Sequence, residues 1–259
     1  MVEEHLLYEI KDNVAWITIN RESQRNSITG QALELFLDYL DMAENDKEVR
    51  VVCITGTGDK AFCSGADLGQ AMGGQGQEAL AVFKRYAAVL KRLASFPKPT
   101  VAKVNGSCLA GGTGFMLGCD IVIAGSHARF GTPEVQVGLF PMMIGALIFR
   151  NVGRKKAMEM ILLGEKLSAD QALAMGMITR VVPQEDLEQA TDSILKSLSA
   201  KSPLGMAIGK RAFHAVANLP LEESMDYLAE KLLEVASTKD AIEGITAFIE
   251  KRPPVFKGE

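Results

Sequence analysis

The residues whose types and spacing could do chemistry lie in two turns built from small side chains. The first turn spans residues 61–68 (Ala-Phe-Cys-Ser-Gly-Ala-Asp-Leu), and the second spans residues 110–112 (Ala-Gly-Gly). Each comes after a β-branched run, at residues 51–55 and 100–104 respectively. Turns of this kind leave backbone N–H groups unpaired and free to face a ligand. Two such turns facing each other would hold the oxygen of a thioester as it gains negative charge.

The elements that must position these turns alternate between strand and helix patterns. β-Branched runs separated by turn residues indicate strands, and apolar residues at helical spacing indicate amphipathic helices. This alternation predicts an α/β fold with parallel strand pairing. The predicted strands are residues 6–10, 14–19, 49–55, 100–105 and 121–124, and the predicted helices contain residues 33–40, 80–93 and 111–119.

The chain becomes mostly helical after about residue 140. Residues 168–171 (Ser-Ala-Asp-Gln) have the spacing of a capping box, and Gly176 is suited to ending the helix that they begin. Three further helical patterns follow between residues 203 and 251. No low-complexity linker divides the chain. We therefore expect an α/β core over residues 1–200 and a helical region over residues 201–259 that packs on the core and on neighbouring subunits.

Composition excludes several classes of function. The 259 residues carry a net charge of −4 with no basic stripe, which argues against a nucleic-acid surface. The 4 cysteines have no CxxC spacing and the 3 histidines form no cluster, so we expect reduced thiols and no metal site. The first residues lack the features of a signal or transit peptide, and no stretch reads as a membrane span. These observations predict a cytoplasmic protein.

Segments spread along the chain resemble the enoyl-CoA hydratase/isomerase (crotonase) superfamily. The resemblance implies a spiral of β-β-α units, C-terminal helices that build trimers or dimers of trimers, and an acyl-CoA substrate. Coenzyme A then belongs to the substrate, and no separate cofactor is expected. The segments that carry the resemblance are residues 61–68, 105–106, 110–112, 119–120, 130–134, 163–165, 172–176, 181–183 and 243–248.

The resemblance implies three catalytic residues. The backbone N–H groups of Ala66 and Gly111 match the two oxyanion-hole donors, and Glu134, in the sequence Thr-Pro-Glu, matches the catalytic glutamate. Such a glutamate gives or takes a proton at carbon and needs a partly desolvated carboxylate with a raised pKa. Without the surrounding motifs, Glu134 would be interpreted as a surface residue on a turn after Pro133.

Position 114 departs from the pattern of the hydratases. There the resemblance implies a second glutamate, which helps to hold and activate water, whereas this chain has Gly114. Glycine supplies neither a base nor a side-chain acceptor. The departure favours a proton shuttle by one glutamate over addition of water.

The resemblance also implies contacts to coenzyme A. It places the adenine near the backbone of Asp67 and Leu68, and it places Phe248 and Lys251 of a neighbouring subunit near the nucleotide. Two of these residues have a plainer interpretation, because Asp67 could cap a helix and Lys251 could complement a helix C-terminus.

Methionines are candidates for an apolar acyl pocket, because their side chains adapt to irregular shapes. Met72 and Met142 are the candidates for lining it, with Met143 beside them. Core packing explains Met142 and Met143 equally well, and it is the favoured interpretation of Met116.

Several functions stay open from the sequence, and they include other enolate chemistry of the family, such as decarboxylation, thioester hydrolysis or C–C cleavage. The favoured one is double-bond isomerisation of an enoyl-CoA by a single glutamate through a stabilised enolate. The alternative within the same family is hydration of a trans-2-enoyl-CoA. A third hypothesis, from another class of protein, is a paralogue that binds acyl-CoA without catalysis. The absence of a glutamate at position 114 suggests this hypothesis.

Overall fold

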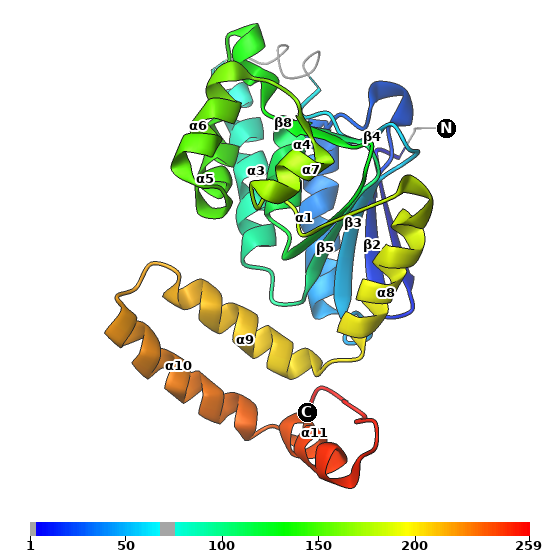
Figure 1. The fold of residues 1–259 in the computed structure, drawn as a ribbon, viewed down its shortest axis with the longest axis vertical. Helices are drawn as coiled ribbons and strands as arrows, with labels where there is room; N and C mark the ends of the chain where they lie inside the picture. The colour runs from blue at the N-terminus through cyan, green and yellow to red at the C-terminus, as the bar shows by residue number, and fades with distance from the viewer. Residues whose placement is uncertain (1–3, 68–75) are drawn as a thin grey trace.

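The computed structural model describes residues 4–67 and 76–259, and it contains two β-sheets with helices packed around them (Figure 1). The larger sheet has the strand order β1-β2-β3-β5-β7-β10, and the smaller has the order β4-β6-β8-β9. β1 (Leu6–Lys11) and β2 (Val14–Ile19) form the predicted antiparallel hairpin, with Asp12 and Asn13 at positive φ in its turn. The other neighbours in the larger sheet pair in parallel, as predicted.

A β-β-α unit repeats along the chain and winds it into a spiral. In each unit the first strand joins the larger sheet, the second joins the smaller sheet, and a helix follows. The spiral predicted from the resemblance is therefore confirmed. The units are β3 (Val51–Gly56), β4 (Ala61–Cys63) and α3 (Gln77–Ala94), then β5 (Thr100–Val104), β6 (Ser107–Leu109) and α4 (Gly111–Leu117), then β7 (Ile121–Gly125), β8 (Arg129–Gly131) and the 3-10 helix η2 (Pro133–Val137).

Apolar side chains from the sheets and helices form a large core and a second, smaller cluster. α1 (Gly30–Asn45) packs against α3, and the ring of Phe36 stacks on Phe115 of α4 with 5.1 Å between ring centroids. Met116 is fully buried in this core, as its sequence context favoured. Burial of such side chains contributes roughly 1.5–3 kcal/mol each, so this core supports the positions of the loops above it.

Short elements follow the third unit and close the core. The capping box at Ser168 is confirmed, since its side chain accepts from the N–H of Gln171, and Gly176 takes a left-handed conformation just past the helix end. The elements are α5 (Met142–Asn151), α6 (Arg154–Leu163), β9 (Leu167–Ser168), α7 (Ala169–Ala174), β10 (Arg180–Val182) and α8 (Leu187–Ser199), with 3-10 helices at Glu22–Gln24 and Gln184–Asp186.

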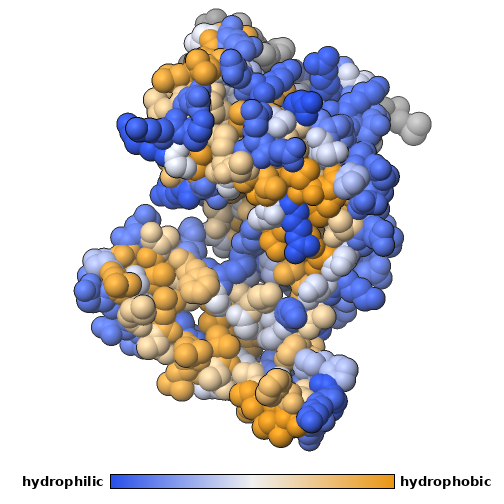
Figure 2. Space-filling view, in the orientation of Figure 1, coloured by the Kyte–Doolittle hydropathy of each residue, from blue (hydrophilic) through white to orange (hydrophobic). Residues whose placement is uncertain are grey.

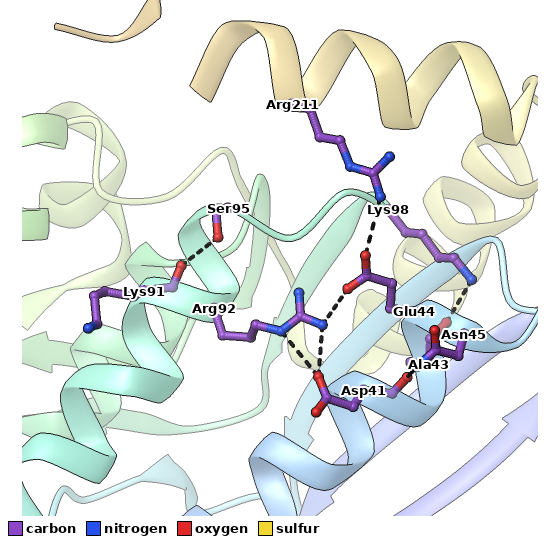
Figure 3. Close-up of polar contacts among 9 residues, drawn as sticks. All are labelled: Asp41, Ala43, Glu44, Asn45, Lys91, Arg92, Ser95, Lys98 and Arg211. Carbon is purple, nitrogen blue, oxygen red and sulfur yellow. Dashed lines mark hydrogen bonds and ion pairs between the residues drawn. The ribbon is translucent and has the colours of Figure 1, made fainter. Parts of the chain in front are cut away.

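Three helices, α9 (Pro203–Val216), α10 (Leu221–Ala236) and α11 (Lys239–Glu250), extend beyond the core (Figure 1). They correspond to the three predicted helical patterns. Ion pairs join α9 to the core, and Figure 3 shows Arg211 meeting Glu44 of α1, which also pairs with Arg92 of α3. The boundary predicted at residue 200 lies in the turn between α8 and α9.

The C-terminal helices expose much of their apolar surface. α10 has no buried residue, and apolar side chains gather on the surface of these helices (Figure 2). A contiguous apolar surface of this kind marks an interaction site. The exposed side chains include Phe213, Leu221, Met225, Leu232, Leu233, Ile242, Ile245, Phe248 and Ile249. Across residues 4–67 and 76–259, no helix is both long and apolar enough to cross a membrane.

Candidate active site

The two small-residue turns lie against each other. Gly65 has φ +100, and a Cβ placed on it would lie 2.7 Å from the Cβ of Ala110 and 3.2 Å from the nitrogen of Gly111. A side chain at position 65 would therefore force the turns apart. Glycine is required here both for its backbone conformation and for this close approach.

Hydrogen bonds fix which way the Ala66 N–H points. The N–H of Ile28 donates to the Gly65 carbonyl oxygen, and the N–H of Asp67 donates to the Ile28 carbonyl oxygen, each over 2.8 Å. This parallel bridge uses the groups on either side of Ala66, so its own N–H faces away from Ile28. It donates to no residue in the described part of the chain, and Ala66 is exposed.

The second turn is held in an unusual backbone conformation. Ala110 has φ 50 and ψ −127, a region that non-glycine residues rarely occupy, and Gly111 then begins α4. The Ala110 N–H donates to the Gly131 carbonyl oxygen over 2.9 Å, and Thr113 Oγ1 donates to the same oxygen over 3.1 Å. The Gly111 N–H, as the first of its helix, has no intrahelical acceptor and donates to none of the described residues.

Glu134 lies in η2, directly after β8, and its carboxylate is only partly exposed. The Oε2 atom is buried and has no hydrogen-bond partner among the described residues. This burial raises the pKa of Glu134 above its ordinary value, with a smaller opposing effect from a backbone hydrogen bond. The carboxylate therefore has the raised proton affinity that proton transfer to or from carbon requires.

Hydrogen bonds hold the backbone around Glu134 in place. The Leu139 N–H donates to the Glu134 carbonyl oxygen over 3.0 Å, and Gln136 Nε2 donates to the Gly164 carbonyl oxygen over 2.9 Å. Gly164, in turn, packs closely on Val135: a Cβ there would lie 2.8 Å from Val135 Cγ2. These contacts fix the position from which the side chain of Glu134 extends.

Tyr86 of α3 contacts the second turn at Gly111, and the sequence did not single it out. Its hydroxyl donates to the Gly111 carbonyl oxygen over 2.6 Å. Burial raises the pKa of Tyr86 well above its ordinary value, and the negative charge of Glu134 raises it further. Tyr86 occupies the same helical stripe as Leu90, so its position in the sequence looks like ordinary core packing.

Gly114 lies on the face of α4 that α3 and α5 cover. A Cβ placed on it would lie 2.3 Å from the Tyr86 hydroxyl oxygen and 2.5 Å from Ile144 Cγ2. The third neighbour, Leu90 Cδ2, would be 3.1 Å away. Position 114 therefore has no space for any side chain without movement of its neighbours.

The structure gives the surroundings of three other predicted site residues. Asp67 forms an ion pair with Arg21, with 2.9 Å between its Oδ2 and the guanidinium. Met142 is the first residue of α5 and is 72% exposed, so core packing is the wrong interpretation for it. Met143 is partly buried and packs against the core. Leu68 and Met72 lie outside the described residues.

Phe248 and Lys251 lie far from the two turns within one chain. α11, which carries Phe248, is at the opposite end of the molecule from α4 (Figure 1). Phe248 is 84% exposed, and Lys251 ends the helix in a left-handed conformation. A role for either at the site requires a second copy of the chain, as the resemblance implied, and it stays a prediction.

Comparison with known proteins decides the family. The sequence matches the model of the enoyl-CoA hydratase/isomerase family over residues 9–259. The chain belongs to this family. It is thus an acyl-CoA enzyme of the crotonase superfamily, as its motifs indicated.

Relatives of this family match nearly the whole chain. The short-chain-enoyl-CoA hydratase of Clostridium acetobutylicum is 32% identical over 249 residues, which cover 96% of this chain and 95% of the relative. The 2,3-dehydroadipyl-CoA hydratase of Escherichia coli is also 32% identical, with 98% of each chain covered. The crystal structure of an enoyl-CoA hydratase from Bacillus anthracis superposes with a TM-score of 0.95 at 31% identity, covering 99% of this chain and 100% of the other.

Proposed function

We propose that this enzyme moves a proton between carbon atoms of an enoyl-CoA thioester, which shifts the double bond. Glu134 is the group that carries the proton, and the N–H groups of Ala66 and Gly111 bind the thioester oxygen. One observation carries the proposal: burial raises the proton affinity of Glu134, while position 114 has no room for a second acid–base side chain unless its neighbours move.

The proposed reaction proceeds through an enolate. Glu134, ionised, takes a proton from C2 of a 3-enoyl thioester, and the electron pair of that C–H bond moves toward the thioester oxygen. The negative charge forms where the two N–H groups point, and one such donor contributes roughly 3 kcal/mol to stabilising the transition state. Glu134 then returns the proton to C4, and the double bond lies between C2 and C3. No atom is gained or lost.

Hydration of a trans-2-enoyl-CoA is the second candidate, and the names of the relatives favour it. The relatives from Clostridium acetobutylicum and Escherichia coli are both named hydratases. Water addition by this chain would then depend on Glu134 alone, because Gly114 carries no side chain to hold water. A paralogue that binds acyl-CoA without catalysis is the third candidate, and the desolvated Glu134 argues against it.

Binding of the substrate is proposed to involve a second copy of the chain. The exposed apolar face of α10 and α11 supports assembly of a homo-oligomer, and Phe248 and Lys251 would then reach the nucleotide of a neighbour's substrate. Met142, exposed at the start of α5, is proposed to contact the acyl chain. Coenzyme A enters as part of the substrate, with no separate cofactor. A cytoplasmic location remains our expectation, although several relatives, among them one from Rattus norvegicus, are named mitochondrial.

Product analysis tests the proposal. We expect the protein to convert a short trans-3-enoyl-CoA into the trans-2 isomer of equal mass, detected by chromatography and mass spectrometry. A product heavier by one water would favour hydration instead. The non-catalytic paralogue would be favoured if the substrate stayed unchanged and if the protein and its Glu134→Gln variant bound the thioester equally well.

A further inference from the structure

Tyr86 is a half-buried polar residue that neither the sequence motifs nor the proposed reaction uses. Its ring lies edge-on against Phe115, with 5.4 Å between centroids and 77° between the ring planes. Phe115 is in turn stacked on Phe36 in the core. The ring of Tyr86 is thus locked in place, and so is the direction of its hydroxyl.

The hydroxyl of Tyr86 is directed at the turn that presents the Gly111 N–H. It donates to the Gly111 carbonyl oxygen over 2.6 Å, on the first peptide of α4. The residue before, Ala110, has an unfavourable backbone conformation at φ 50, which costs of order 1–3 kcal/mol and persists only where neighbours enforce it. Ala110 and Thr113 hold this turn toward β8, through the Gly131 carbonyl oxygen, and Tyr86 holds it from α3.

The same hydroxyl fills the space beside Gly114. It would lie 2.3 Å from a Cβ at that position, which is too close for any side chain to fit while the hydroxyl stays in place. Because burial keeps the phenol protonated at neutral pH, it remains a hydrogen-bond donor to Gly111. One group therefore both holds the Gly111 peptide and closes position 114.

We propose that Tyr86 is a positioning residue of the active site: its hydroxyl orients the Gly111 turn so that the Gly111 N–H meets the thioester oxygen. This inference rests on the proposed enolate chemistry, because it assigns Tyr86 a role in stabilising that charge. Tyr86 acts through Gly111 and transfers no proton itself.

The test measures enolate formation without turnover. Acetoacetyl-CoA ionises to an enolate with a near-ultraviolet absorption band, and the fraction ionised when bound reports how well the site stabilises charge on the thioester oxygen. We expect Tyr86→Phe to lower the ratio of bound enolate to bound keto form by roughly three- to tenfold, the effect of one neutral hydrogen bond. Affinity for desulfo-CoA, which lacks the acyl group, should stay unchanged.

A second variant disturbs the same hydrogen bond without removing the tyrosine. The Cβ introduced by Gly114→Ala would displace the Tyr86 hydroxyl, so the bound enolate should decrease in this variant too. Two controls match these changes. Tyr39→Phe removes a hydroxyl that lies on α1 and bonds to Glu4 and Leu6, and Gly145→Ala adds a methyl group to α5 where no atom lies within 4 Å.

The outcomes separate the two hypotheses. If the unaltered protein binds acetoacetyl-CoA without producing the enolate band, the proposed function fails, and the role of Tyr86 fails with it. If the unaltered protein shows the band and a folded Tyr86→Phe variant shows the same band, only the role of Tyr86 is overturned. Should Tyr86→Phe not fold, an undiminished band in Gly114→Ala would overturn it equally.

Discussion

The two sides of the active site are held in opposite ways. On one side, the turn at Ala110 and Gly111 presents only backbone groups, and hydrogen bonds from Tyr86 and Thr113 hold it on two faces. On the other side, Glu134 presents a side chain whose buried Oε2 has no partner among the described residues. The difference matches two tasks. In the proposed reaction the backbone N–H groups stabilise charge, for which they work best when they are fixed in advance, and Glu134 carries the proton.

Removing the carboxylate of Glu134 should have the largest effect. We expect Glu134→Gln to lower kcat by about 10²- to 10⁴-fold, because a positioned acid–base group contributes that much. Binding of coenzyme A should remain, since the substitution keeps the size of the side chain. Steady-state kinetics and calorimetric titration measure the two quantities. A kcat within threefold of the original would show that the carboxylate takes no part in the reaction.

Separating the two turns of the site should have the next largest effect. Gly65→Ala would place a methyl group 2.7 Å from the Ala110 Cβ and so separate the two turns. We expect kcat to fall by roughly 10²-fold, the effect of losing one oxyanion donor. Gly76→Ala is the matched control, because Gly76 also has positive φ but no atom lies near its Cβ position. Equal losses in both variants would mean that backbone strain, not the separation of the turns, is responsible.

The pH dependence should sharpen the comparison, because the backbone N–H groups of the turns do not titrate and Glu134 does. Glu134 must be ionised to take a proton, and burial raises its pKa. Activity should therefore decline, as the pH falls, at a higher pH than an ordinary glutamate would give. A profile of kcat/KM against pH, with circular dichroism over the same range as a check on folding, measures this. A decline at or below the ordinary glutamate range would contradict the assignment.

The smallest expected effect is on stability. Because the pKa of Glu134 is higher in the folded protein than in the unfolded chain, ionisation of this residue lowers the free energy of unfolding above that pKa. Glu134→Gln should therefore raise the Tm at neutral pH, and the gain should shrink as the pH falls through the pKa of the folded state. Thermal unfolding at two pH values measures it, with Glu222→Gln on exposed α10 as a control. A Tm that falls equally at both pH values would contradict this prediction.

Sequence patterns predicted the long elements well and the short ones poorly. The hairpin at β1 and β2, the amphipathic helices α1 and α3, and the parallel strands β3, β5 and β7 of the larger sheet follow from sequence patterns, whereas the three-residue strand β10 was not predicted. The smaller sheet does not, because β4, β6 and β8 have three residues each, too few to show alternation. Residues 61–63 were interpreted as part of a turn for this reason.

The site itself was predictable where motifs exist and hidden where side chains meet across the fold. The backbone turns were singled out from local sequence and Glu134 from the family resemblance, and the structure places the Gly65 and Gly111 turns in contact. Tyr86 was missed because a tyrosine in an amphipathic stripe gives no local sign that its hydroxyl reaches another helix. The exposure of Met142 was equally hidden, since periodicity cannot tell which end of an apolar helix leaves the core.

The most direct measurement is mass spectrometry of a short trans-2-enoyl-CoA after incubation with the protein in D₂O. The account predicts deuterium in place of carbon-bound hydrogen, with no water added, in the original protein and not in Glu134→Gln. Such a result requires both an enolate or dienolate and Glu134 as the group that exchanges its proton with solvent. A product that has gained one D₂O, or a thioester that stays free of deuterium, would contradict the account.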